Sequence, residues 1–196
     1  MPRKYEQTKR AEQQQETRRR IVAAASELHR TEGPARTTMS AIAERAGVQR
    51  NTLYRHFPDE RSILSACSAH FFAEHPMPAP DEWTAIGDPA ARLRRGLDEL
   101  YAYWTATEQM IAHVVRDAEV NPLVDETLSR SGGPRLAAIR SVLLGAWPSK
   151  RRTPELEAAV DLALNFRTWQ ALTRDSRLTP AAAADLMTRM VCCSQT

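Results

Sequence analysis

The chain has 196 residues, 42% of them hydrophobic and 26% charged, with a formal net charge of +3 at pH 7. These values describe a soluble globular protein that can bury a core. Residues 1–20 are too polar for a signal peptide and no apolar run reaches membrane length, so we expect a cytoplasmic protein without a membrane partner. Cys67, Cys192 and Cys193 have neither disulfide nor metal spacing, and we expect no metal or cofactor.

The charge is unevenly distributed along the chain. Residues 1–64 hold 13 Lys/Arg against 8 Asp/Glu, whereas residues 65–196 hold 14 against 16. The N-terminal third is therefore basic and the remainder slightly acidic. An excess of cationic side chains in one region is typical of proteins that bind a polyanion there.

The N-terminal segment, residues 1–16, is a polar, basic arm. It is either a disordered arm or an early extension of the first helix, and it either enters a minor groove or serves only as a solubilising tail. From Thr17 the pattern becomes helical, with Ile21, Ala24 and Leu28 on one face. Gly33 and the proline after it end that helix.

Residues 38–58 have the pattern of a helix-turn-helix. Thr38 stands where an N-cap is needed, Gly47 follows the last apolar position of the first helix, and Pro58 ends the second helix. The apolar residues between them have helical spacing and mark the buried sides of the two helices: Met39, Ile42, Ala43, Ala46, Leu53 and Phe57.

The second of these helices has an outer face that carries no acidic residue. At about 100° per residue, Arg55 points away from the buried side, with Asn51 and Thr52 beside it. Such groups donate hydrogen bonds to phosphates and base edges, whereas an ordinary solvated face mixes Glu with Lys. The predicted DNA-binding residues are Thr38, Arg50, Asn51, Thr52, Tyr54, Arg55 and His56.

The residues of this region resemble those of one known family. The runs Ala41-Ile42-Ala43-Glu44-Arg45-Ala46-Gly47-Val48 and Asn51-Thr52-Leu53-Tyr54-Arg55-His56-Phe57-Pro58 resemble the DNA-binding domain of TetR/AcrR bacterial transcriptional regulators. The resemblance covers about residues 17–66. Gln49 stands where the family usually has Ser or Thr, and Glu60 where it often has a phosphate-binding lysine, with Arg61 next to it.

The rest of the chain is helical in character, so the predicted fold class is all-α. Asp59 caps a connecting helix, which completes a DNA-binding domain over residues 17–75. A Pro-rich break follows, and residues 81–196 form a second helical domain. In it, Asp88-Pro89 opens one helix and the apolar residues from Met110 mark the next.

The last two helices begin at Thr153-Pro154 and Thr179-Pro180, with expected lengths of about twenty and about fourteen residues. The helix from Thr153 has two apolar faces, which indicates one face toward the domain and one toward a partner. The resemblance implies a homodimer that joins these helices in a four-helix bundle on a near-palindromic operator. The predicted dimer residues are Leu156, Val160, Ala163, Leu186, Met187 and Met190.

The predicted function is a sequence-specific transcriptional regulator, a repressor that a small, largely apolar ligand releases from its double-stranded DNA operator. The alternatives are a constitutive helix-turn-helix protein without an effector pocket and, more remotely, an all-α enzyme. The enzyme is disfavoured because no phosphate loop, catalytic triad or metal-spaced cluster is present, so no catalytic residue is assigned. The candidate ligand residues, for each of which core packing is the alternative, are Tyr103, Trp104, Met110, His113, Phe166 and Trp169.

Overall fold

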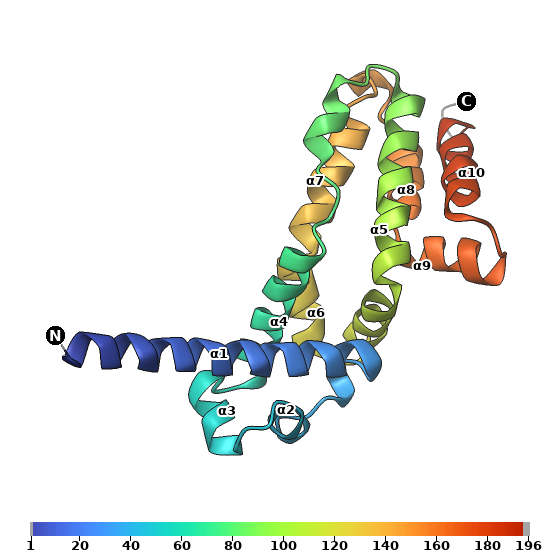
Figure 1. Ribbon diagram of the computed structural model, residues 1–196. Helices are drawn as coiled ribbons and strands as arrows, with labels where there is room; N and C mark the ends of the chain where they lie inside the picture. Colours follow the sequence, from blue (N-terminus) through green and yellow to red (C-terminus); the bar gives the residue numbers. More distant parts are fainter. Residues whose placement is uncertain (1, 194–196) are drawn as a thin grey trace. The chain divides into compact units, whose positions relative to one another are not determined.

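The computed structural model describes the backbone of residues 2–193 and the side chains of residues 8–193 (Figure 1). Its regular elements are helices, with no strand in that range, which confirms the predicted all-α class. The chain forms two compact units: residues up to Pro76 with Gln109–Ser131, and Met77–Glu108 with the residues from Gly132 onward. Gln109–Ser131 thus packs with the N-terminal residues, whereas the sequence places it in the second domain.

The first unit is built around α1, Pro2–Thr31, and the helices that pack on it. On α1 pack α2 (Met39–Arg45) and α4 (Glu60–Glu74). The helix α3 (Arg50–His56) packs on α2, and α6 (Pro122–Ser131), which follows the long α5 (Pro89–Ala118), packs on α4. A short 3-10 turn, Pro34–Arg36, connects α1 to α2. The start of α4 is fixed by a capping box, because Asp59 accepts from the Ser62 N–H at 2.8 Å.

The first helix is longer than the sequence pattern predicts. It begins at Pro2 and not near Thr17, so the basic segment is an extension of α1. The residues from Arg3 to Glu32 include no proline or glycine and many Gln, Glu, Lys and Arg, which favour helix. Residues 8–16 are all exposed, so nothing in the described part of the first unit covers them.

One apolar core holds the helices of the first unit together. Ile21 on α1, Leu53 on α3 and Phe57 just after α3 are fully buried. Cys67 of α4 is buried against α1, where its thiol donates to the carbonyl of Val22 at 3.8 Å. Burying a side chain the size of Ile or Phe stabilises the fold by about 1.5–3 kcal/mol, so these residues fix α3 on α1. The other members of this core are Val22, Ala24, Ala25, Leu28, Met39, Ile42, Ala43, Ala46 and Ile63.

A buried carboxylate joins the end of α5 to the turn between α1 and α2. Asp117 accepts from the Ala35 N–H at 2.9 Å and from Arg116 at 2.7 Å, and Arg116 also donates to the Glu32 carbonyl at 3.0 Å. A side chain at Gly33, whose φ is +100°, would collide with both residues of α5. Burial opposes ionisation of Asp117, but the hydrogen bonds from Arg116 and Ala35 lower its pKa below the usual value.

We expect acid to weaken the first unit through His29, which is 5% exposed. Burial lowers the pKa of His29 to about 4, against the opposing effect of Asp117. The unfolded chain therefore binds more protons between pH 4 and 6.5, and stability falls as the pH decreases through that window. The loss should approach about 3 kcal/mol at pH 4.

Urea unfolding of the full chain at pH 7 and pH 4.5 measures this loss. The variant His29→Gln should lose less stability than the wild type over that interval, because glutamine does not titrate. The control His75→Gln changes an exposed histidine and should keep the wild-type dependence. Equal losses in the wild type and His29→Gln would show that His29 does not cause the acid sensitivity.

The second unit contains the N-terminal part of α5 with α7 (Gly133–Leu144), α8 (Pro154–Ala163), α9 (Phe166–Gln170) and α10 (Pro180–Cys193). Short 3-10 turns occur at Pro80–Ala85 and Ser149–Arg151, and a π-helical turn, Ala171–Asp175, follows α9. The sequence predicts two helices between Asp88 and Ala118, which is wrong because α5 is continuous. Its middle is polar but contains no glycine or proline, so nothing breaks the backbone hydrogen bonds.

The predicted helix of about twenty residues from Thr153 is also interrupted. The cap prediction is confirmed, since the Thr153 hydroxyl accepts from the Leu156 N–H, but α8 ends at Ala163. The Asn165 side chain caps α9 by accepting from the Arg167 N–H at 2.8 Å. The Tyr101 hydroxyl donates to the Ala163 carbonyl at 2.9 Å, which satisfies a carbonyl at the end of α8.

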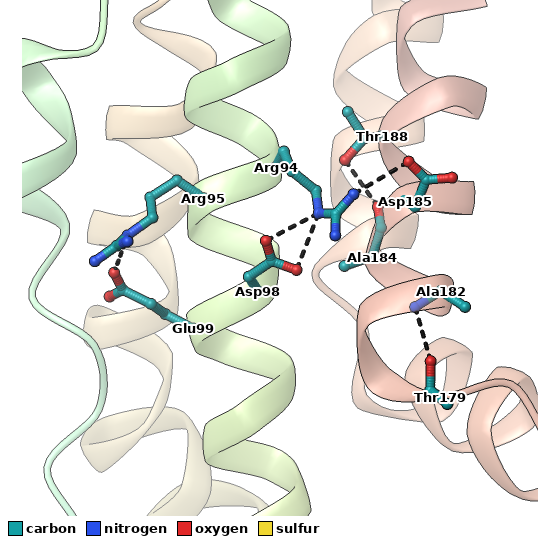
Figure 2. Close-up of polar contacts among 9 residues, drawn as sticks. All are labelled: Arg94, Arg95, Asp98, Glu99, Thr179, Ala182, Ala184, Asp185 and Thr188. Atoms are coloured by element: carbon teal, nitrogen blue, oxygen red, sulfur yellow. Dashed lines mark hydrogen bonds and ion pairs between the residues drawn. The ribbon is translucent and has the colours of Figure 1, made fainter.

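An ion pair joins α10 to α5 in the second unit. Figure 2 shows Arg94 of α5 between Asp98 of the same helix, at 2.9 Å, and Asp185 of α10, at 3.1 Å. At the start of α10, the Thr179 hydroxyl accepts from the Ala182 N–H at 3.2 Å. The ion pair shows that Asp185 lies on the side of α10 that faces α5.

Candidate nucleic-acid interface

The turn between α2 and α3 has the geometry that a helix-turn-helix requires. Gly47 adopts φ +63°, a left-handed conformation that glycine reaches at little cost. The Val48 N–H donates to the Ala43 carbonyl and the Gly47 N–H to the Glu44 carbonyl, both at 3.0 Å, which is the Schellman arrangement. The predicted cap of α2 is present, because the Thr38 hydroxyl accepts from the Ala41 N–H at 3.1 Å.

The second helix of this motif, α3, presents a polar face to solvent. Leu53 is fully buried, which turns the opposite side of the helix outward. Arg50, Asn51 and Arg55 are exposed, as is Thr38 at the start of α2. Thr52 and His56 are half-buried, and Tyr54 is 40% exposed, one of the few large apolar or aromatic side chains on the described surface. The predicted DNA-binding residues therefore lie on the surface of the motif.

Two arginines of α1 donate hydrogen bonds to the backbone of α3 and of the turn between α2 and α3. Arg18 donates to the His56 carbonyl at 3.1 Å, and its guanidinium lies 4.1 Å from the centre of the Phe57 ring. Arg20 donates to the Ala46 carbonyl at 2.5 Å. Sequence patterns did not predict these contacts, because the arginines lie in a run of charges that reads as a solvated helix surface.

His56 is less suited to phosphate binding than its position predicts. Burial, followed by the nearby Arg55 and Arg18, lowers the pKa of His56, so the imidazole is neutral at pH 7. Its Nε2 atom is buried and has no hydrogen-bond partner among the described residues. In the chain without DNA, this position therefore presents a neutral side chain and not a cation.

The first turn of α4 does not supply the cation that the family often places there. Glu60 is exposed at that position, and the neighbouring Arg61 forms an ion pair with Glu126 of α6 at 2.6 Å. The hydrogen bond from Arg61 lowers the pKa of Glu126. Arg61 is therefore engaged within the unit and does not replace the missing lysine.

The candidate ligand residues are divided between the two units. Met110 and His113 belong to the first unit, where both are half-buried and the His113 Nδ1 atom has no hydrogen-bond partner among the described residues. Tyr103, Trp104, Phe166 and Trp169 belong to the second unit. Burial raises the pKa of the Tyr103 phenol to about 12, against the opposing effect of the nearby Thr107, and its hydroxyl makes no hydrogen bond of good geometry in the described part of the chain.

Three of the candidates in the second unit form one aromatic cluster. Trp104 lies edge-on to Phe166 at 5.7 Å between ring centres and 6.1 Å from Trp169. Trp169 is fully buried, and its Nε1 atom has no hydrogen-bond partner among the described residues. The cluster is extended by Tyr101, which stacks on Trp104 at 5.5 Å. The rings pack on one another, which makes them part of the core of this unit.

Most of the predicted dimer residues lie inside the protomer. Leu156, Val160 and Ala163 of α8 are fully buried, and Met187 of α10 is 2% exposed. They cannot reach a second chain, because they face the core of their own unit. Leu186 is half-buried, and Met190 is 50% exposed. The sequence pattern did not distinguish the two apolar faces of α8; the outward one carries Leu162, which is 49% exposed.

The geometry of α2, the turn and α3 defines the class of the protein. A short helix, a Schellman turn at glycine and a second helix with an outward face of arginine, amide and hydroxyl groups constitute a helix-turn-helix of the DNA-binding type. Among the described residues, no group of His, Cys, Asp and Glu is arranged to hold a metal ion. No described helix has the length and apolarity needed to cross a bilayer.

Comparison with known proteins relates the helix-turn-helix segment to one family. Residues 21–67, which span the helix-turn-helix, match the model of the bacterial regulatory proteins of the tetR family. The regulator TtgR of Pseudomonas putida is 35% identical over 92 residues, which cover 46% of this chain and 43% of TtgR. The helix-turn-helix segment, residues 21–67, is therefore that of the tetR family. The match to TtgR nevertheless spans less than half the length of that relative.

Solved structures share the fold over nearly the whole chain. NalD, the secondary repressor of the MexAB-OprM multidrug efflux pump in Pseudomonas aeruginosa, has a TM-score of 0.63 at 18% identity and covers 93% of this chain and 97% of its own. AibR, solved with isovaleryl coenzyme A and operator DNA, also has a TM-score of 0.63 at 18% identity, with coverage of 89% and 97%. At such low identity, these similarities establish the fold alone.

Proposed function

We propose that this chain is a sequence-specific DNA-binding transcriptional regulator that acts as a homodimer on a near-palindromic operator. It represses by occupying the operator and is released by a small, largely apolar ligand. The observation that carries the proposal is the outward face of α3, which presents Arg50, Asn51 and Arg55 to solvent. Arginine and asparagine can each pair with a base edge in the major groove through two hydrogen bonds.

Dimer formation is supported by the surfaces that α8 and α10 leave uncovered. Arg140 of α7 pairs with Glu157 at 2.9 Å, which places α7 on one side of α8. Arg94 pairs with Asp185, which places α5 on one side of α10. The exposed Leu162 and Met190 lie on other sides of these two helices, which contact each other. A two-fold dimer through this surface presents two copies of α3 to successive major grooves, about 34 Å apart.

A ligand with an apolar body and a hydrogen-bond acceptor is supported by the aromatic residues of the second unit. The Tyr103 hydroxyl is buried there without a hydrogen-bond partner of good geometry among the described residues. Leaving such a group unpaired costs about 1–3 kcal/mol, which an acceptor on a ligand recovers. The fold is shared with AibR, which was solved with isovaleryl coenzyme A. A coupling of about 1–3 kcal/mol between ligand and operator is enough to change occupancy several-fold.

Arg55→Ala tests the proposed role of α3. The full chain first selects double-stranded DNA from a random library, and affinities are then measured on the selected duplex and on a scrambled one. The variant should bind the selected duplex more weakly, by about 1–3 kcal/mol for each half-site, and should discriminate less against the scrambled duplex. An unchanged ratio of the two affinities would exclude a base contact by Arg55.

Two controls separate base contacts from charge. Tyr54→Phe should weaken binding to both duplexes by similar factors, as expected for a phosphate contact. Arg130→Ala removes the same charge from an exposed position on α6 and should leave the affinity ratio unchanged. If the wild type selects no sequence at all, the proposal of sequence-specific regulation fails.

A further inference from the structure

The start of α3 is capped differently from the starts of α2, α8 and α9. Before α2, the Thr38 hydroxyl accepts from the Ala41 N–H at 3.1 Å. The side chains of Thr153 and Asn165 cap α8 and α9 in the same manner. The cap residue of α3 is Gln49, whose side chain makes no such hydrogen bond. Gln49 therefore does not give α3 the stabilisation that a Ser, Thr, Asp or Asn cap gives.

The backbone of Gln49 takes over part of the capping. Its carbonyl accepts from the Thr52 N–H at 2.9 Å and from the Leu53 N–H at 3.1 Å. The Thr52 N–H is the donor that a capping side chain would otherwise bind. The Gln49 side chain is exposed and makes no hydrogen bond to the described residues. Its amide therefore keeps two N–H donors and one carbonyl acceptor for a binding partner.

This amide lies at the end of α3 that contacts DNA in a helix-turn-helix. Gln49 directly precedes Arg50 and Asn51, which are exposed in the first turn of α3. The N-terminal residues of a recognition helix are the ones that contact base edges in the major groove. The preceding residue, Val48, packs against the apolar core and so helps to hold the backbone at Gln49 in place. Gln49 thus combines a held backbone with an unused amide beside the proposed reading residues.

We infer that the Gln49 side chain reads an adenine in each half-site of the operator. The inference rests on the proposed function, because it requires α3 to lie in the major groove. Adenine presents an acceptor, N7, beside a donor, N6–H, on its major-groove edge. The Gln49 amide donates to N7 and accepts from N6, whereas a serine or threonine here would be shorter and engaged by the cap. The position gives up helix stability for a base contact, as functional sites often do.

The test measures the affinity of the full chain for duplexes that carry single base-pair changes. The wild type first selects a duplex from a random library, and each position is then changed in turn, symmetrically in both half-sites. Replacing the A·T pair that Gln49 reads should weaken wild-type binding about tenfold per half-site. Gln49→Ser should lose this penalty at that pair alone. The pair read by Arg55 should keep its penalty in Gln49→Ser and lose it in Arg55→Ala.

Two further variants make the assignment specific. Gln49→Glu keeps the length of the side chain but replaces its donors by acceptors, so the preference at the same pair should move from adenine toward cytosine, whose N4 donates. Gln170→Ser removes an amide from α9 in the second unit and should keep every wild-type penalty.

Urea unfolding of Gln49→Ser provides a readout that is independent of DNA. A serine here should cap α3, so the midpoint of unfolding should rise and any lost discrimination would not come from unfolding. A lower midpoint would mean that glutamine itself stabilises α3, which contradicts the argument from capping.

The affinities also separate this inference from the proposed function. Equal weakening of all duplexes by Gln49→Ser would indicate a phosphate contact, and unchanged affinities would indicate no contact. Either result excludes base reading by Gln49, while a loss of specificity in Arg55→Ala would still support the proposed function. If the wild type selects no sequence, the proposed function fails and this inference fails with it.

Discussion

Replacing Leu162 and Met190 together by aspartate is expected to convert a dimer into a folded monomer. These side chains are 49% and 50% exposed in the single chain, on α8 and α10. Introducing a charge there costs little in the isolated protomer, whereas burying it against a second copy without a partner is costly. Sedimentation at micromolar concentration should give the mass of a dimer for the wild type and of a monomer for the double variant.

The loss of the dimer should also remove most of the operator affinity. When one half-site is bound, the second recognition helix acts at a high effective concentration, which raises affinity by about 10²–10⁴-fold. The double variant should therefore bind the selected duplex at least about 100-fold more weakly. Ala137→Asp, at an exposed position on α7, adds one charge elsewhere and should remain a dimer. A wild type that sediments as a monomer would contradict this prediction.

The same substitution at a buried position should act differently. Met187 is 2% exposed, so Met187→Asp places an unpaired charge in the protomer's own core. Urea unfolding should show a large loss of stability for Met187→Asp and little change for the Leu162/Met190 double variant. Comparable destabilisation by both would mean that Leu162 and Met190 are needed for the fold of the protomer.

The helix-turn-helix could be predicted from the sequence because its signals are local. The Thr38 cap, the Gly47 turn and the apolar positions of α2 and α3 act within a few residues of one another, and each is present in the structure. The end of α8 could not be predicted in this way. There the Tyr101 hydroxyl donates to the Ala163 carbonyl, 62 residues away in the sequence, a contact that the local pattern does not contain.

Periodicity also shows which residues are apolar without showing what covers them. The two faces of α8 have similar composition, and only the packing of α5, α7 and α10 decides that Val160 is buried while Leu162 is exposed. For charged residues, the sequence pattern predicts a solvent-exposed side chain even where the structure has a tertiary contact. Asp117 and Arg18 look like surface residues in the sequence, yet one is bonded to the turn after α1 and the other to the end of α3. Such contacts depend on residues that tertiary structure alone brings together.

Trp169→Ala is expected to have the largest effect on stability in the second unit. The side chain is fully buried, and its ring lies 5.2 Å from that of Phe166 and 6.1 Å from that of Trp104. Truncating a buried tryptophan removes its apolar contacts and leaves a cavity, at a cost of about 3–5 kcal/mol. For a chain of this size, the melting temperature should fall by about 6–20 °C, measured by circular dichroism. A fall of less than about 2 °C would contradict its assignment to the core.

Smaller changes then separate packing from ligand binding. Trp169→Phe keeps an aromatic ring and should lose less stability than Trp169→Ala. Tyr103→Phe removes only a buried hydroxyl without a described partner, and should leave stability unchanged or raise it slightly.

A panel of aromatic carboxylates and short acyl thioesters, added to the complex with the selected duplex, tests release from DNA. If Tyr103 binds the effector, Tyr103→Phe should keep wild-type DNA affinity and respond several-fold less to the active compound; an unchanged response would exclude Tyr103 from the ligand site. Because Trp169→Ala destabilises the unit as a whole, its response alone cannot assign the site, whereas the Tyr103→Phe comparison is made in a protein of normal stability.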